Sequence, residues 1–122
     1  MFFLDSYAII ELARGNPSYR PFVREPVITM RANLLEVYYI LSQSEETALA
    51  DSTLKLLGPH SVDLPVELIA IVAEFRRRKK GATGRRFSYA DASGYVYARE
   101  NGYEFLTGAE EFEGLPSVRY VR

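Results

Sequence analysis

Residues 1–12 read Met-Phe-Phe-Leu-Asp-Ser-Tyr-Ala-Ile-Ile-Glu-Leu. The apolar run at positions 2–4 predicts a short buried strand, which Asp5 ends. Either Asp5 or Ser6 can cap a helix that begins near Tyr7. An acidic side chain therefore stands where a core strand meets a helix N-terminus, which in an open α/β sheet is the rim where ligands bind. Asp5 is thus either a helix cap or a functional carboxylate.

Apolar segments alternate with helical patterns along the rest of the chain. Further strands are predicted at 27–30, 61–64, 103–106 and 118–121, the last of them at an edge. Helices are predicted at 31–41, 45–57, from 65 into the basic run at 76, and from 88 to about 100. This alternation predicts a parallel sheet with helices on both faces. The pattern by itself leaves the order of the strands open.

Length and composition narrow the function classes. A chain of 122 residues, with 48% hydrophobic and 25% charged residues, predicts a single globular domain over 1–122. The absence of cysteine excludes disulfides, thiolate metal sites and a Cys nucleophile. The one histidine, His60, lies in a Gly-Pro-His-Ser turn, so zinc chemistry and a Ser-His-Asp triad are disfavoured. Carboxylates with a hard cation remain.

No stretch of the sequence has the apolar length of a membrane span, and the N-terminus lacks the basic flank and cleavage site of a signal peptide. We therefore expect a cytoplasmic protein without a membrane partner.

The helix predicted over 31–41 is apolar almost all round, so we expect it to be buried on both sides. Glu36 lies within it, and a carboxylate in such surroundings is costly unless a partner neutralises it. A bound metal is one candidate partner. An ion pair with Arg31 or Arg14 is the alternative.

Asp91 lies in the first turn of a helix that Ser88 caps. The helix dipole keeps a carboxylate there ionised and ready to bind a cation.

Seven positive charges fall within eleven residues, at Arg76, Arg77, Arg78, Lys79, Lys80, Arg85 and Arg86. They serve either as favourable charges at a helix C-terminus or as contacts to an RNA backbone. Gly81 and Gly84 predict a mobile connection between the two halves of this run.

Four motifs now stand in order along nearly the whole chain. They are Phe3-Leu4-Asp5-Ser6, Asn33-Leu34-Leu35-Glu36-Val37, Ser88-Tyr89-Ala90-Asp91-Ala92, and Phe105-Leu106-Thr107-Gly108 followed by Glu111-Phe112. Together they resemble PIN-domain nucleases and, at this chain length, the VapC-type toxins of toxin–antitoxin pairs.

The resemblance implies a three-layer α/β/α fold with a five-stranded parallel sheet of order 3-2-1-4-5. It implies Mg²⁺- or Mn²⁺-dependent cleavage of RNA, with Asp5, Glu36 and Asp91 as catalytic and metal-binding acids. Ser6, Asn33 and Thr107 would be supporting polar residues. A cognate antitoxin is the implied protein partner.

The chain departs from the family pattern after Thr107-Gly108, where an acid is common and this sequence has Ala109. Glu111 is then either a fourth metal ligand or, with Glu110, part of a solvated acidic pair. The departure leaves open a catalytically weakened PIN domain that binds RNA or protein without cutting. An aspartyl phosphotransferase ranks third, because Tyr7 occupies the position where that chemistry usually has a second acid.

A homodimer is also expected. The chain has 9 Tyr and 7 Phe residues, and several lie on helices that already have apolar residues for a core face. Apolar surface should therefore be left for a second copy to bury. The candidates for a dimer surface are Tyr38, Tyr39, Tyr95 and Tyr97, unless the core absorbs them.

Overall fold

Five parallel strands form the centre of the fold, which a computed structural model describes for residues 1–122. The strands are β1 (Phe2–Leu4), β2 (Val27–Met30), β3 (Ser61–Val62), β4 (Glu104–Thr107) and β5 (Val118–Tyr120). Their order in the sheet is β3-β2-β1-β4-β5, all neighbours being parallel. This confirms the order that the resemblance implies, and β5 is an edge strand as predicted.

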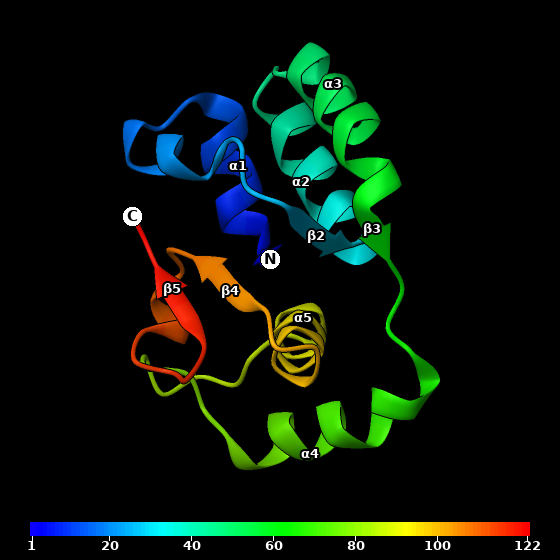
Figure 1. The fold of residues 1–122 in the computed structure, drawn as a ribbon, viewed down its shortest axis with the longest axis vertical. Helices are drawn as coiled ribbons and strands as arrows, with labels where there is room; N and C mark the ends of the chain where they lie inside the picture. The colour runs from blue at the N-terminus through cyan, green and yellow to red at the C-terminus, as the bar shows by residue number, and fades with distance from the viewer.

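Helices cover both faces of the sheet (Figure 1). One side carries α1 (Ser6–Arg14), α2 (Arg31–Gln43) and α3 (Thr47–Leu57), and the other carries α4 (Ile69–Arg78) and α5 (Tyr89–Glu100). The 3₁₀ turns are η1 (Pro17–Phe22), η2 (Gly58–His60), η3 (Val66–Leu68) and η4 (Glu110–Phe112). None of the helices combines the length and the apolar composition that a membrane-spanning helix requires.

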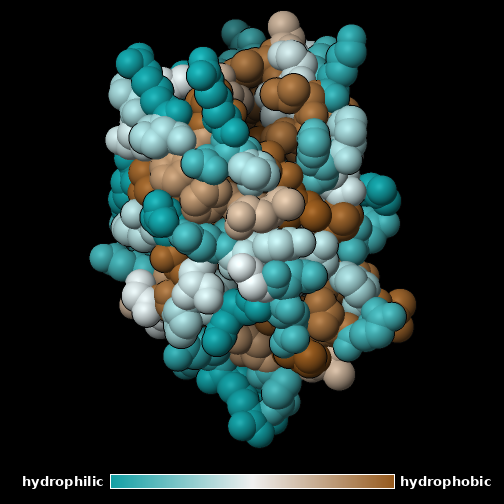
Figure 2. All heavy atoms as spheres, viewed as in Figure 1, coloured by the Kyte–Doolittle hydropathy of each residue, from teal (hydrophilic) through white to brown (hydrophobic).

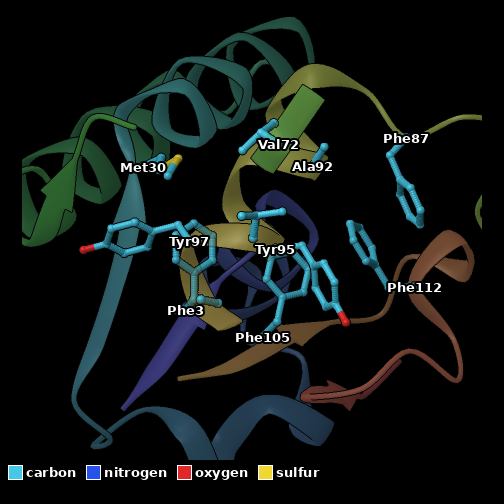
Figure 3. Packing of buried hydrophobic residues seen from close by; sticks show 11 residues of the cluster. Phe3, Met30, Val72, Phe87, Ala92, Tyr95, Tyr97, Phe105 and Phe112 are labelled. Atoms are coloured by element: carbon cyan, nitrogen blue, oxygen red, sulfur yellow. The ribbon is translucent and has the colours of Figure 1, made fainter. Parts of the chain in front are cut away.

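Side chains of β1 and β4 point alternately to the two faces of the sheet, and a separate hydrophobic core lies on each face. Phe3 and Phe105 pack with Tyr95 and Phe112 on the side of α4 and α5, and Figure 3 shows these rings in contact. Leu4 and Leu106 face the opposite core, built from α1, α2 and η1. Successive side chains of a strand point to opposite faces, so each strand fills both cores.

The pairing of β1 with β4 brings the ends of the two strands together. Leu4 pairs with Leu106 in the sheet, and the N–H of Asp5 donates to the carbonyl of Leu106 at 3.1 Å. Asp5 and Thr107 therefore lie side by side at the rim where the strand order reverses, which is the ligand-binding position of open α/β sheets.

The prediction that the helix over 31–41 is buried on both sides is wrong. Leu35 is 74% exposed and Tyr39 is 62% exposed on α2, and Glu36 between them is exposed as well. The helix packs on α1, α3 and the sheet through Leu34, Val37 and Leu41 and leaves its remaining face uncovered.

Three other local expectations also need correction. Tyr95 and Tyr97 belong to the core and are not available as dimer-surface residues. Pro65 does not open a helix directly. It has an extended backbone with ψ of 139°, so a 3₁₀ turn precedes α4. The helix predicted over 45–57 begins at Thr47.

Candidate active site

Asp5 occupies the junction between β1 and α1 and is 3% exposed. Its Oδ2 accepts a hydrogen bond of 2.6 Å from Oγ1 of Thr107, whereas its Oδ1 is buried without a partner. The side chain makes no capping bond to α1, although Asp5 stands at the N-cap position. Asp5 is therefore the N-cap residue by position, but its side chain does not cap the helix, and one oxygen of a buried carboxylate is left without a partner.

Buried polar residues surround Asp5. Asn33 on α2 donates to Oγ of Ser6 at 3.0 Å, and Oδ1 of Asn33 has no partner. Oγ1 of Thr107 also accepts from the N–H of Ala109 at 3.0 Å, which fixes the direction of the hydroxyl hydrogen toward Asp5. The three supporting residues predicted from the sequence thus all lie around the end of β1.

Thr29 is a supporting residue that the sequence did not reveal. It is buried in β2, and its hydroxyl donates to the carbonyl of Leu4 at 2.7 Å, directly before Asp5. A threonine within a β-strand is ordinary, so only its burial distinguishes it.

Asp91 and Glu36 lie near Asp5 from two helices. Burial and the charge of Asp91 raise the pKa of Asp5 to about 7, with a smaller contribution from Glu36. Burial also raises the pKa of Asp91, and the charges of Glu36 and Glu111 add to this shift. The N–H of Asp91 is capped by Oγ of Ser88 at 3.0 Å, as predicted.

Neither predicted ion pair for Glu36 is formed. Arg31 pairs with Asp63 at 2.8 Å, and Arg14 pairs with Glu46 at 2.6 Å. Glu36 is thus an exposed carboxylate whose charge acts on Asp5 and Asp91.

The donor set fits a hard cation. Its members are oxygens, one of them an unpartnered buried carboxylate oxygen, and the acids repel one another in the absence of a positive charge. No three acidic or histidine side chains come close enough together to enclose an ion by themselves. Magnesium usually keeps several waters and takes only one or two carboxylates, so a full protein cage is not required.

Glu111 turns toward the basic segment. Its Oε1 accepts from the hydroxyl of Thr83 and lies 3.7 Å from Nε of Arg85, and its side chain is 20% exposed. Glu110, in contrast, is exposed and pairs with Arg122 at 2.9 Å. The solvated-pair interpretation therefore holds for Glu110 and is wrong for Glu111.

The seven cations predicted to contact RNA separate into two groups. Arg76 and Arg86 donate to main-chain carbonyls, and Arg77 and Arg78 pair with Glu74. Lys79, Lys80 and Arg85 are exposed, and Arg85 alone among them contacts a carboxylate.

No family model matches the chain, and no curated protein matches its sequence. Solved structures do match over almost the whole length. A toxin–antitoxin complex from Klebsiella pneumoniae has a TM-score of 0.74 at 14% identity, over 98% of this chain and 96% of the other. VapC20 of Mycobacterium tuberculosis, described as a sarcin–ricin loop cleaving toxin, has a TM-score of 0.71 at 19% identity, over 98% and 99%.

VapBC2 from Rickettsia felis, solved with a DNA fragment from its promoter, has a TM-score of 0.72 at 14% identity, over 99% of this chain and 98% of the other. Identities this low establish the fold and leave the activity to be argued from the site. The strand order and these matches agree with the motifs in the sequence: the chain has the PIN-domain fold of the VapC-type toxins.

Proposed function

We propose that this protein is a Mg²⁺- or Mn²⁺-dependent endoribonuclease and the toxin of a toxin–antitoxin pair, acting in the cytoplasm. The observation that carries the proposal is the buried, unpartnered Oδ1 of Asp5 beside the charges of Asp91 and Glu36, at the switch point of the sheet. The proposal is also supported by the structural similarity to VapC20, which is described as a sarcin–ricin loop cleaving toxin.

Asp5, Asp91 and Glu36 would hold the cation. When bound, such an ion supplies an activated water and offsets charge on the scissile phosphate. The residues of the chain do the positioning. Thr107 holds Oδ2 of Asp5, so that Oδ1 is the oxygen left to bind. Asn33 and Ser6 fix the start of α1 next to it.

A carboxylate cluster repels RNA, so positive charge beside it is needed to hold the backbone. Lys79, Lys80 and Arg85 are exposed and, unlike the other cations of the basic segment, neither pair with Glu74 nor donate to main-chain carbonyls, so they are the best candidates for phosphate contacts.

An apolar groove supports a protein partner. It has a volume of about 480 Å³ between α2 and α3 and is lined mainly by Leu34, Leu35, Tyr38 and Leu54. Figure 2 shows apolar side chains reaching the surface at this end of the molecule. The matched structure from Klebsiella pneumoniae is titled as a toxin–antitoxin complex, which supports an antitoxin as the partner here. A homodimer through exposed residues such as Tyr39 would bury part of the same apolar surface.

The alternative is a PIN fold that binds RNA or protein without cutting. Ala109 favours it, because the position directly after Thr107-Gly108 carries no carboxylate. Cleavage of a labelled RNA with and without Mg²⁺ separates the two functions.

The test of the nuclease proposal is Asp5→Asn. This variant should fold and lose Mg²⁺-stimulated cleavage, and Mg²⁺ should no longer raise its melting temperature. For the parent, a cation at 100 times its Kd adds about 2.7 kcal/mol of stability. Cleavage by Asp5→Asn at the parental rate would show that the site is wrongly assigned. Asp63→Asn, which changes an exposed acid paired with Arg31, is the control and should behave as the parent.

A further inference from the structure

The segment between α4 and α5 forms an ordered turn rather than the mobile connection predicted from its glycines. Lys80 and Arg86 form an antiparallel bridge. Within this segment, the N–H of Gly81 donates to the main-chain carbonyl of Arg85 at 2.8 Å. The N–H of Gly84 donates to the main-chain carbonyl of Gly81 at 2.9 Å. Gly84 has φ of +85°, a conformation that glycine adopts without strain. We call residues 80–86 the cationic hairpin.

Glu111 contacts this hairpin at three places. Its Oε1 accepts from the hydroxyl of Thr83 and faces Nε of Arg85 at 3.7 Å. The main-chain carbonyl of Glu111 accepts from the N–H of Ala82 at 3.1 Å. Residues 28 positions apart in the sequence are thereby joined by side-chain and main-chain contacts.

Gly81 makes room for the Glu111 carboxylate. A Cβ at this position would overlap Oε2 of Glu111, and Gly81 is itself buried. Oε2 is buried there without a hydrogen-bond partner. Burying a carboxylate oxygen without a partner is unfavourable, so stability of the fold does not account for an acid at this position.

The ends of the hairpin are held by other contacts. Phe87, directly after it, packs on Phe112 with ring centroids 4.8 Å apart, and Figure 3 shows the two rings facing each other. Arg86 donates to the carbonyls of Arg76 and Arg77 at the end of α4, both at 3.1 Å. These contacts hold the base of the hairpin, and Glu111 holds its tip.

The hairpin leads through Phe87 to Ser88, which caps the N–H of Asp91 in the first turn of α5. The charge of Glu111 also contributes to the raised pKa of Asp91. Arg85 lies between Glu111 and solvent, with 82% of its side chain exposed. One carboxylate thus contacts the exposed guanidinium of Arg85 and acts through its charge on Asp91.

We propose that Glu111 is a positioning residue that clamps the cationic hairpin beside the carboxylate cluster, so that Arg85 and Lys80 bind the phosphates of the RNA strand at the site. The inference rests on the proposed ribonuclease function and assigns the place where the backbone is held. The clamp consists of the Glu111 carboxylate, the Thr83 hydroxyl and the space left by Gly81.

RNA affinity measured in EDTA tests the clamp, because the clamp and a purely electrostatic role of Glu111 predict opposite changes for Glu111→Ala. If Glu111 acted only as a negative charge, both Glu111→Gln and Glu111→Ala would tighten RNA binding. The clamp predicts different results. Glu111→Gln keeps an acceptor for Thr83 and should bind a short single-stranded RNA at least as tightly as the parent. Glu111→Ala should bind about five-fold more weakly, with a salt slope shallower by roughly one unit.

Two further variants serve as matched comparisons. Gly81→Ala changes no charge but displaces the carboxylate, so it should weaken binding as Glu111→Ala does. Glu110→Ala removes the neighbouring charge, which pairs with Arg122 and not with the hairpin, and should bind at least as tightly as the parent. Tighter binding by Glu111→Ala, equal to that of Glu111→Gln, overturns the proposal.

Limited proteolysis with trypsin provides a measurement that needs no RNA. Trypsin cleaves after Lys79, Lys80, Arg85 and Arg86, so release of the hairpin exposes several sites. Glu111→Ala and Gly81→Ala should be cut there several-fold faster than the parent, and Glu111→Gln and Glu110→Ala at the parental rate. Equal rates for all variants overturn the clamp. A parent that neither binds nor cuts RNA overturns the proposed function instead, whatever the proteolysis shows.

Discussion

Oγ1 of Thr107 lies 2.6 Å from Oδ2 of Asp5, although 102 residues separate the two in the sequence. The hydroxyl satisfies one carboxylate oxygen, and the other is left buried and free. A carboxylate so placed is costly in its charged form unless a cation is bound. This relationship leads to the first two predictions.

The metal-free protein should lose stability as the pH rises. Burial and the charges of Asp91 and Glu36 raise the pKa of Asp5 to about 7, from the ordinary aspartate value of 3.8. Between these two values the folded state binds more protons than the unfolded state, so the free energy of unfolding falls with increasing pH. Asp5→Asn removes this loss and should be more stable than the parent at pH 8 by up to about 4 kcal/mol. Urea unfolding in EDTA at pH 5 and pH 8 measures the difference. An advantage of Asp5→Asn that fails to grow with pH would contradict the prediction.

Thr107→Val should destabilise the protein more than Thr107→Ser. Valine leaves Oδ2 of Asp5 and the N–H of Ala109 without their partner, at a cost of about 1–3 kcal/mol for a buried group. The serine variant keeps the hydroxyl. Because the bond from Thr107 lowers the pKa of Asp5, the valine variant should also titrate at higher pH. Unfolding curves and the carboxyl NMR signal of Asp5 measure both effects, and equal stability of the two variants would refute the prediction.

The basic segment should separate into structural and RNA-binding cations. Arg76 donates to the carbonyl of Phe87 at 2.9 Å and stacks on Tyr89 at 4.1 Å, so Arg76→Gln should lower stability by about 1 kcal/mol. Lys79→Gln and Lys80→Gln should leave stability unchanged and make the salt slope of RNA binding shallower by roughly one unit per lost contact. Thermal unfolding and binding titrations at several salt concentrations distinguish the groups. The assignment fails if the lysine variants keep the parental salt slope.

Gly94→Ala should disturb the packing of α5 on the sheet. A Cβ at this position would lie 2.8 Å from Cε1 of Phe3 and 3.4 Å from Cε1 of Phe105. Overpacking of this kind costs about 1–3 kcal/mol. Gly58→Ala is the matched control, because Gly58 has helical backbone angles and nothing within 4 Å of its Cβ position. Denaturant unfolding of the two variants should show a loss for Gly94→Ala alone.

Local patterns predicted most of the elements because each follows from neighbouring residues. The apolar runs formed strands within two residues of their predicted bounds, and Ser88 caps α5 as its spacing indicates. Asp5, Glu36 and Asp91 could be recognised as a set because the motifs that contain them resemble those of one family in their order along the chain.

Burial was harder to predict than helicity. The sequence around Glu36 is apolar on several sides, yet Leu35 and Tyr39 are exposed because no further helix covers that face of α2. Tyr95 and Tyr97, in contrast, are absorbed by the core under α4. The number of neighbours around a helix depends on the whole topology and not on the helix's own residues.

The sequence by itself determined the alternation of strands and helices, the apolar residues of β1 and β4, and the acids that stand where elements begin or end. Only the tertiary structure decided that Asp5 is held by Thr107 and that Glu111 is held over Gly81 rather than solvated with Glu110. The physical reason is distance along the chain. A pattern repeats within one element, whereas these contacts join segments 28 and 102 residues apart and leave no periodicity from which they could be inferred.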